Sequence, residues 1–270
     1  MKVIKNRKKT RRILKGYKSL SFIPTMGSLH NGHISLIKKA KRDKNKIIVS
    51  IFVNPKQFEN NKDYKSYPRN LRKDLNVLKK QKIDFVFLPR VKDIYSYQTK
   101  NKIFLDKFSK NLCGKYRSGH FKGVINIVNR LVEIVRPNKI YLGKKDYQQL
   151  ILIKKHFSKN NIKIKIIECN THRDSFGLAE SSRNKSLSKI QLNIARKVSQ
   201  ILKKNKIIIK RNFQNYKLNN LKRQIISLGL NKIEYLNLLN LKTLKYPKIN
   251  ENFNIFIAYY LGKTRLIDNV

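Results

Sequence analysis

The sequence has few cysteines and no long apolar runs. Its two cysteines, Cys113 and Cys169, lie far apart and outside any CxxC pattern. This spacing shows neither the pattern of a disulfide framework nor that of a cysteine-built zinc cage, and it favours a reducing compartment. The longest apolar stretches, residues 47–53 and 255–260, are far shorter than the roughly 20 residues that a membrane span needs. Because the basic N-terminal segment has no apolar core either, we expect a soluble, cytoplasmic protein without a membrane partner.

Acidic residues are also scarce. The chain has 63 Lys and Arg against 15 Asp and Glu, a formal net charge of +48 on 270 residues. Such a charge points to polyanionic partners. However, the sequence has 47 Lys, 34 Ile and 30 Asn but only four Ala, a skew typical of an AT-rich genome, and the lysines are spread along the whole chain. We therefore interpret most of the basicity as a solvated surface and expect no specific nucleic-acid partner.

Apolar patterning predicts alternating strands and helices over the first two thirds of the chain. The expected strands are residues 20–23, 47–53, 85–88, 140–142 and, exposed on one face, 162–166. The expected helices are residues 33–41, a helix around 71–78, the strongly amphipathic 121–135, and 147–157. This alternation is typical of an α/β fold with a Rossmann-like, doubly wound parallel sheet.

The pattern changes near residue 172. A polar segment, residues 171–188, precedes an expected helix at 190–202. The β-rich runs that follow are 233–241, 253–261 and 264–269, which suit an antiparallel sheet. We therefore predict two domains: residues 1–172 form the Rossmann-like domain, and residues 173–270 form a smaller α+β domain.

The most informative segment is PTMGSLHNGH, from Pro24 to His33, where the first strand ends and the first helix begins. Ligands of open α/β sheets lie beyond the carboxyl ends of strands, and a helix N-terminus attracts phosphate. His30 and His33 project to one side of this junction, and Gly32 between them lets an anion approach the backbone. We interpret the pair as a phosphate site, whereas the isolated His156 is interpreted as structural.

The HxGH signature in this segment resembles that of nucleotidyl-transferring α/β enzymes that activate carboxylates with ATP. Further segments resemble the pantothenate synthetase (pantoate-β-alanine ligase) family, in the same order along the chain. They are VSIFVNPKQF at 49–58, YPR at 67–69, RSGHFKGV at 117–124, GKKDYQQ at 143–149, SSRN at 181–184 and RLIDN at 265–269. The likeness covers nearly the whole chain.

The resemblance implies a two-step reaction. Pantoate and ATP give pantoyl adenylate and pyrophosphate, and β-alanine then displaces AMP to give pantothenate. The implied small-molecule partners are pantoate, β-alanine and ATP, with Mg²⁺ carried by the nucleotide rather than by protein ligands. The resemblance further implies a homodimer, an ATP- and pantoate-binding role for residues 1–172, and a lid role for residues 173–270.

The resemblance also implies which residues form the site. His33 is implied as the proton donor, and the other catalytic groups are His30, Lys145 and Arg183. Pantoate and β-alanine are implied to bind Met26, Asn54, Gln57 and Gln149, where the side-chain amides offer both donors and acceptors. The residues implied to bind ATP are Met26, Gly27, Ser28, Leu29, His30, Asn31, Gly32, His33, Gly143, Lys144, Lys145, Asp146, His172, Glu180, Ser181, Ser182 and Arg183.

Three positions depart from the family pattern. The family usually has Pro at Ser118, Asp at Phe176 and an apolar residue at Glu180. If it points inward, a carboxylate at position 180 weakens ATP binding by like-charge repulsion, so the departures bear on efficiency more than on identity. For His120, helix capping and a substrate-facing role are equally open.

Two alternatives also stay open. One is another HxGH nucleotidyltransferase, which keeps the nucleotide on its product; the segment Asn54–Phe58 argues against it. The other is a degenerate ligase fold that acts as a basic, RNA-associated protein. The intact set of His30, His33, Gln57, Lys145, Gln149 and Arg183 argues against degeneration.

Overall fold

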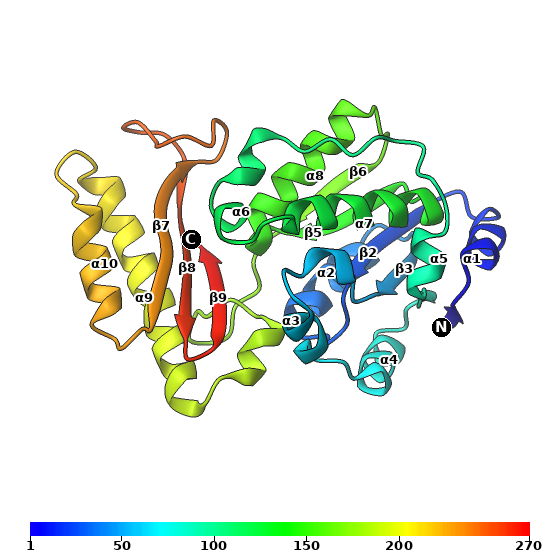
Figure 1. Ribbon diagram of the computed structural model, residues 1–270, viewed down its shortest axis with the longest axis horizontal. Helices are drawn as coiled ribbons and strands as arrows, with labels where there is room; N and C mark the ends of the chain where they lie inside the picture. The colour runs from blue at the N-terminus through cyan, green and yellow to red at the C-terminus, as the bar shows by residue number, and fades with distance from the viewer. The chain divides into compact units, whose positions relative to one another are not determined.

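The computed structural model describes all 270 residues, which divide into two compact units, Met1–Asn170 and Thr171–Val270 (Figure 1). The sequence placed the boundary two residues later, after residue 172. None of the helices combines the length and the apolar character that crossing a lipid bilayer requires.

The first unit is built on a six-stranded sheet in which every pairing is parallel. The strands are β1 (Lys2–Ile4), β2 (Leu20–Thr25), β3 (Lys46–Ile51), β4 (Phe85–Phe87), β5 (Lys139–Gly143) and β6 (Lys165–Cys169). Their order across the sheet is β1-β4-β3-β2-β5-β6. The Rossmann-like, doubly wound sheet predicted from the sequence is thereby confirmed.

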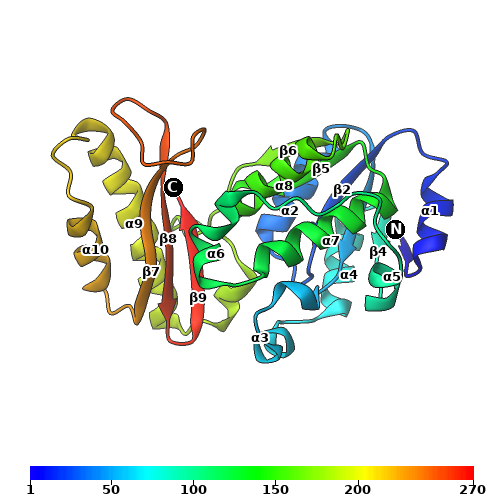
Figure 2. The same ribbon diagram turned by 45° about the horizontal axis from the view of Figure 1, so that its top comes forward.

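Helices and short 3-10 turns connect these strands. They are α1 (Arg7–Leu14), α2 (Asn31–Lys41), η1 (Pro55–Gln57), α3 (Asn61–Ser66), α4 (Leu71–Lys80), α5 (Val91–Tyr95), η2 (Lys107–Lys110), α6 (Cys113–Tyr116), α7 (His120–Val135), η3 (Lys144–Asp146) and α8 (Tyr147–Lys159). On one face of the sheet, Ile23, Val49 and Val86 pack with Ile37 of α2 and Leu78 of α4. Side chains alternate along strands, so the sheet also presents side chains on its other face. This face is covered by α7, which contacts β2, and by α8, which contacts β5. These two helices lie side by side (Figure 2).

The strand order places the candidate site. β2 lies between β3 and β5, because the chain adds β3 and β4 on one side of β2 and β5 and β6 on the other. Ligands of open α/β sheets bind where the strand order reverses, beyond the carboxyl ends of the strands. The loops after β2, β3 and β5 meet at this edge.

The second unit is a smaller α+β fold, as predicted. Its antiparallel sheet has the order β7 (Lys232–Asn240), β8 (Phe253–Leu261), β9 (Thr264–Asn269). The turn η4 (Ser182–Ser186) precedes α9 (Lys189–Arg211), and α10 (Leu218–Ile226) packs beside α9 (Figure 1). Val198 and Leu202 of α9 and Leu221 of α10 share a core with Ile255 and Ile257 of β8.

The structure differs from the sequence interpretation in local places. The strand predicted at 162–166 begins at Lys165, because Ile162 N–H donates to Phe157 O and closes the end of α8, and pairing with β5 starts at Lys165. The helix predicted to end at residue 202 continues to Arg211, with Asn205 and Ile209 on its buried face. The elements β1, α1 and α10 carried no clear signal in the sequence.

Candidate active site

The loop between β2 and α2 is held in a tight conformation by one carboxylate. Gly27 (φ +79°) and Ser28 (φ +49°) both adopt left-handed backbone. Asp74 of α4, only 3% exposed, accepts the N–H of Ser28 and the N–H of Leu29, each at 2.8 Å. A Cβ at Gly27 would lie 2.9 Å from Asp74 Oδ2, so only glycine leaves room for this approach. The carboxylate therefore fastens the loop to α4.

The two histidines of the HxGH signature cap α2 with their Nδ1 atoms. His30 Nδ1 accepts Gly32 N–H at 3.1 Å, His33 Nδ1 accepts His30 N–H at 3.4 Å, and the rings lie 4.1 Å apart. A neutral imidazole whose Nδ1 accepts carries its proton on Nε2. The hydrogen-bond network thus assigns both rings the Nε2–H form, which makes each Nε2 a donor.

Several backbone donors of this segment are already used within the protein. Besides Ser28, Leu29 and Gly32, Gly27 donates its N–H to Thr25 Oγ1 at 3.2 Å. Gly32 N–H is thus already paired within the loop, and the approach of an anion to the backbone beside Gly32 stays a prediction. The imidazole Nε2–H groups are the donors better suited to an anion.

Three residues predicted to bind substrate contact one another at the ends of β2 and β3. Asn54 is fully buried and caps η1, and its Nδ2 donates to Gln57 Oε1 at 3.2 Å. Gln57 Nε2 in turn donates to Met26 Sδ at 2.9 Å. The loops after two neighbouring strands thus form one connected group of side chains.

The backbone of Gln57 is held from α7. His120 Nδ1 lies 2.7 Å from Gln57 O, and its Nε2 lies 3.0 Å from Arg117 Nη1. Because the guanidinium can only donate, His120 carries its proton on Nδ1 and donates to Gln57. Both ring nitrogens of His120 thus take part in contacts with Gln57 and Arg117. His120 therefore anchors η1.

The other predicted site residues of the first unit follow the carboxyl end of β5. Gly143 ends β5, and Lys144, Lys145 and Asp146 form η3 immediately after it. In α8, two adjacent glutamines play different parts. Gln148 is buried and bonded to the backbone of residues 108, 111 and 113, so its role is structural. Gln149 is half-buried on the next position of the helix.

The predicted residues of the second unit are close to one another within it. Glu180 N–H donates to His172 O at 3.0 Å, and Ser181 Oγ accepts Arg183 N–H at 3.3 Å. Ser182 is buried at the start of η4. The segment is anchored by Arg173, which makes a two-pronged ion pair with Asp268 of β9 at 2.7 and 2.8 Å.

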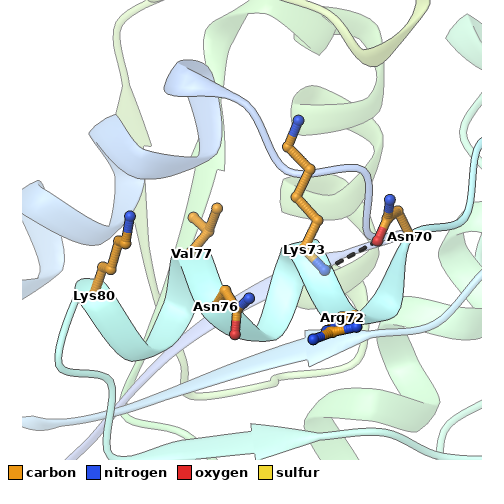
Figure 3. A pocket seen from close by; sticks show the side chains of 6 residues that line it. All are labelled: Asn70, Arg72, Lys73, Asn76, Val77 and Lys80. Atoms are coloured by element: carbon orange, nitrogen blue, oxygen red, sulfur yellow. Dashed lines mark hydrogen bonds between the residues drawn. The ribbon is translucent and has the colours of Figure 1, made fainter.

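A basic hollow lies elsewhere, on α4 (Figure 3). It has a volume of about 390 Å³ and is lined by Asn70, Arg72, Lys73, Asn76, Val77 and Lys80. Asn70 caps the helix through its contact with Lys73 N–H at 3.0 Å (Figure 3). None of the predicted site residues lines this hollow, so it is separate from the loops described above.

Comparison with known proteins identifies the family. The family model for pantoate-beta-alanine ligase matches residues 2–270. The chain belongs to this family. A pantothenate synthetase of Pseudothermotoga lettingae is 40% identical, with 100% of this chain and 98% of the relative covered. One of Francisella tularensis subsp. mediasiatica is 44% identical, with 93% and 88% covered.

Solved structures of the ligase family agree with the fold. The pantoate-beta-alanine ligase of Francisella tularensis, complexed with beta-gamma ATP and beta-alanine, has a TM-score of 0.85 and 41% identity and covers 100% of this chain and 97% of that one. The pantothenate synthetase of Thermus thermophilus has a TM-score of 0.89 and 29% identity, with 100% and 99% covered. The family resemblance seen in the motifs is thereby confirmed.

Residues that depart from the ligase family pattern lie at exposed or half-buried positions. Ser118 is exposed, and Phe176 is 51% exposed with the Arg196 guanidinium 4.1 Å from its ring centre. Glu180 is half-buried. Asp174 holds the same loop by accepting the N–H groups of Phe176 and Leu178. The loop around Phe176 therefore keeps a carboxylate as its anchor.

Sequence interpretation missed two residues that support the site. Asp74 lies on the Leu71–Leu78 stripe of α4, and an acid on an apolar stripe was a signal available in the sequence. Tyr95 gave no such signal; its hydroxyl donates to Asn54 at 2.6 Å. The prediction for His156 is confirmed, since it is fully buried, accepts Phe104 N–H at 3.2 Å, and has its pKa lowered by burial.

Proposed function

We propose that this chain catalyses the ATP-dependent condensation of pantoate with β-alanine. Pantoate's carboxylate attacks the α-phosphorus of ATP and releases pyrophosphate, and the amine of β-alanine then displaces AMP to give pantothenate. The family match over residues 2–270 carries this proposal. The complex of the related ligase with beta-gamma ATP and beta-alanine supports ATP and β-alanine as ligands.

The adenylation step needs donors aimed at the oxygens on which charge develops. We assign this role to His30 and His33, whose Nδ1 atoms accept backbone N–H groups so that each Nε2 is a donor. His33 serves as the proton donor. Lys145, just beyond β5, and Arg183 of the second unit supply positive charge.

Pantoate is assigned to the group formed by Met26, Asn54 and Gln57, together with Gln149. The contacts among the first three support this assignment, because they put amide donors beside an apolar thioether. Pantoate itself combines a carboxylate and hydroxyls with a gem-dimethyl group. A mixed polar and apolar pocket suits such a molecule.

ATP is assigned to the loop Met26–His33, to Gly143–Asp146, and to His172 and Glu180–Arg183 of the second unit, which acts as a lid. Mg²⁺ enters as part of the nucleotide substrate, since phosphate oxygens are ligands that it prefers. No three His, Cys, Asp or Glu side chains are grouped so that they could hold a metal ion.

The test is pyrophosphate release from ATP and Mg²⁺ with pantoate, run with and without β-alanine, while AMP and pantothenate are followed in the same tubes. We expect sustained turnover only when both substrates are present, with AMP and pantothenate formed in equal amounts. A product that retains the nucleotide would instead identify a nucleotidyltransferase. No turnover by folded protein would refute the proposed activity.

We further propose a homodimer in the cytoplasm. The dimer follows the family resemblance, and light scattering at twice the mass of one chain would support it. The location is favoured by the two buried free thiols, Cys113 and Cys169.

A further inference from the structure

Tyr95 lies at the end of α5, outside all of the sequence motifs discussed above. It contacts the side chains that we assign to pantoate. Its hydroxyl donates to Asn54 Oδ1 at 2.6 Å. Its ring has Lys56 Nζ 4.3 Å and the Arg130 guanidinium 5.0 Å from its centre. Burial raises the pKa of Tyr95 to about 12, although Arg130 and the bond to Asn54 oppose the shift. The hydroxyl thus keeps its proton and acts as a donor at neutral pH.

Tyr95 is one of four partners that together hold the Asn54 amide. Oδ1 accepts two donors, the Tyr95 hydroxyl and Lys56 N–H at 3.2 Å. Nδ2 faces two acceptors, Gly123 O and Gln57 Oε1, both at 3.2 Å. Exchanging the oxygen and nitrogen would set Nδ2 against the Lys56 N–H and Oδ1 against Gly123 O in a fully buried place, which is costly. One orientation of the amide is therefore selected.

The Asn54 amide in turn orients Gln57. Because Gln57 Oε1 accepts from Asn54, Gln57 Nε2 turns to the other side, where Met26 Sδ lies 2.9 Å away. A thioether sulfur is a weak acceptor. An oxygen of the substrate can therefore replace the sulfur as the acceptor of Gln57 Nε2–H at little cost, and the new hydrogen bond is stronger than the one that is lost.

We propose that Tyr95 is a positioning residue of the pantoate site, which acts through Asn54 to hold Gln57 with its NH₂ group toward an oxygen lone pair of pantoate. The proposal rests on the proposed function, because it takes pantoate as the ligand of Gln57. It gives Gln57 the part of a donor rather than an acceptor. Tyr95 itself touches no substrate.

The first test compares Tyr95→Phe with Tyr97→Phe. Tyr97 is a matched control, since its ring also lies beside Arg130, at 5.2 Å, but its hydroxyl donates to Arg130 O at 3.1 Å. For Tyr95→Phe we expect the KM for pantoate to rise about tenfold, the scale of one lost buried hydrogen bond, with the KM for ATP within about twofold. For Tyr97→Phe both constants stay within about twofold. Equal pantoate KM values in the two variants would overturn the proposal.

A second test separates positioning from general support of the fold. Tyr95→Phe is combined with Gln57→Ala, and pantoate KM is measured for the single and double variants. If Tyr95 acts through Gln57, the double variant is no worse than Gln57→Ala alone. If the increase in pantoate KM in the double variant is instead the product of the two single increases, Tyr95 acts independently of Gln57, and the proposal is wrong.

Crystal structures of both tyrosine variants give a readout that does not depend on turnover. In Tyr95→Phe we expect the Asn54 side chain to shift, because Oδ1 keeps only the Lys56 N–H as a donor, and Gln57 Nε2 to leave Met26. Tyr97→Phe keeps the Asn54–Gln57 and Gln57–Met26 contacts. An unchanged Gln57 in Tyr95→Phe refutes the positioning role even if the wild-type chain is active. A wild-type chain inactive with pantoate refutes the proposed function instead, and the two structures still decide the geometry around Gln57.

Discussion

His33 combines two roles that a single alanine substitution would remove together. Its Nδ1 caps α2 by accepting His30 N–H, and its Nε2 is the donor assigned to the nucleotide. Asparagine can offer an acceptor near the Nδ1 position but does not reach the Nε2 position. A pair of variants therefore separates stability from chemistry.

We expect His33→Ala and His33→Asn each to lower adenylate formation about 100-fold, as for other lost transition-state donors. His33→Asn should keep more of the stability, since loss of a cap costs about 1 kcal/mol. Pyrophosphate release and thermal melting measure the two effects. Near-normal release by folded His33→Asn would remove His33 from the chemistry.

Asp74 supports the same loop from beneath. In Asp74→Asn, one carboxylate oxygen becomes an NH₂ group that faces the N–H of Ser28 or Leu29. An unpaired buried donor costs about 1–3 kcal/mol of stability. We expect that loss, together with a rise in the KM for ATP and adenylation about 10- to 100-fold slower, because small displacements of catalytic groups are expensive. The Glu59→Gln variant, at an exposed position, also removes one negative charge and should change none of these three quantities.

Many residues of the candidate site could be proposed from the sequence because they lie within short local motifs. PTMGSLHNGH carries its glycines and histidines within ten residues, and the caps that His30 and His33 make on α2 are contacts within that string. Asp74 and Tyr95 act across 46 and 41 residues of sequence, respectively. Contacts of that range exist only once the sheet has brought β2, β3 and α4 together, so patterns along the chain do not reveal them.

The close packing of η1 against α7 requires a glycine in α7. A Cβ at Gly123 would lie 2.0 Å from Lys56 O and 2.8 Å from Gln57 Cα. Neither is a flexible side-chain end, so Gly123→Ala must push η1 away from the helix. We expect a loss of about 1–3 kcal/mol in unfolding free energy and a higher pantoate KM, with the ATP KM less affected. Gly16→Ala, where nothing lies within 4 Å, is the matched control; equal behaviour of the two variants would contradict the argument.

Lys206 of α9 predicts a pH dependence within the second unit. Burial first, then Lys210 and Arg173, lower the pKa of Lys206 from 10.5 to about 8, and its Nζ donates to Asn254 Oδ1 at 2.7 Å. Between pH 8 and 10.5 the unfolded chain holds this proton more often than the folded chain does. The free energy of unfolding should therefore rise with pH over this window, by about 1–3 kcal/mol from this group.

Urea denaturation at pH 7, 8, 9 and 10 measures that rise. In Lys206→Met, the part of the rise in unfolding free energy that comes from Lys206 should be absent. In Lys204→Met, at an exposed position of the same helix, the full rise should remain. Other lysines also lose charge at high pH, so the difference between the two variants is the quantity to compare. Identical slopes would show that Lys206 titrates normally.

At the level of helices and strands, periodicity predicted those that bury one clear face. The 121–135 stripe predicted α7 almost to the residue, and every strand except β1 was located within a few residues. Predictions failed where charge interrupted the pattern or where pairing decided the outcome. In the second half of α9, Lys203, Lys204 and Lys206 interrupt the apolar periodicity, so the sequence pattern did not indicate that the helix continues. The alternation from Ile162 to Ile166 gave no information on where β5 would begin to pair with β6.

The charge of +48 belongs to the molecule as a whole. The basic hollow on α4 is one place where cations gather, with Arg72, Lys73 and Lys80 in its lining (Figure 3). These are three of 63 basic residues, and Lys is present in nearly every segment of the chain. Counterion release depends on the number of phosphates neutralised rather than on why each cation is there. RNA binding should therefore be weak, independent of sequence and distributed over the surface.

We expect two unrelated single-stranded RNA 20-mers to bind with affinities within about twofold, and binding to weaken steeply with salt, at a log-log slope of about −0.7 per phosphate contacted. Fluorescence anisotropy at increasing KCl measures both. Neutralising Arg72, Lys73 and Lys80 to Gln should change the slope no more than neutralising the exposed Lys203, Lys204 and Lys210 of α9. If only the α4 changes abolish binding, the hollow is a dedicated polyanion site, and the basic surface has a function that codon bias does not explain.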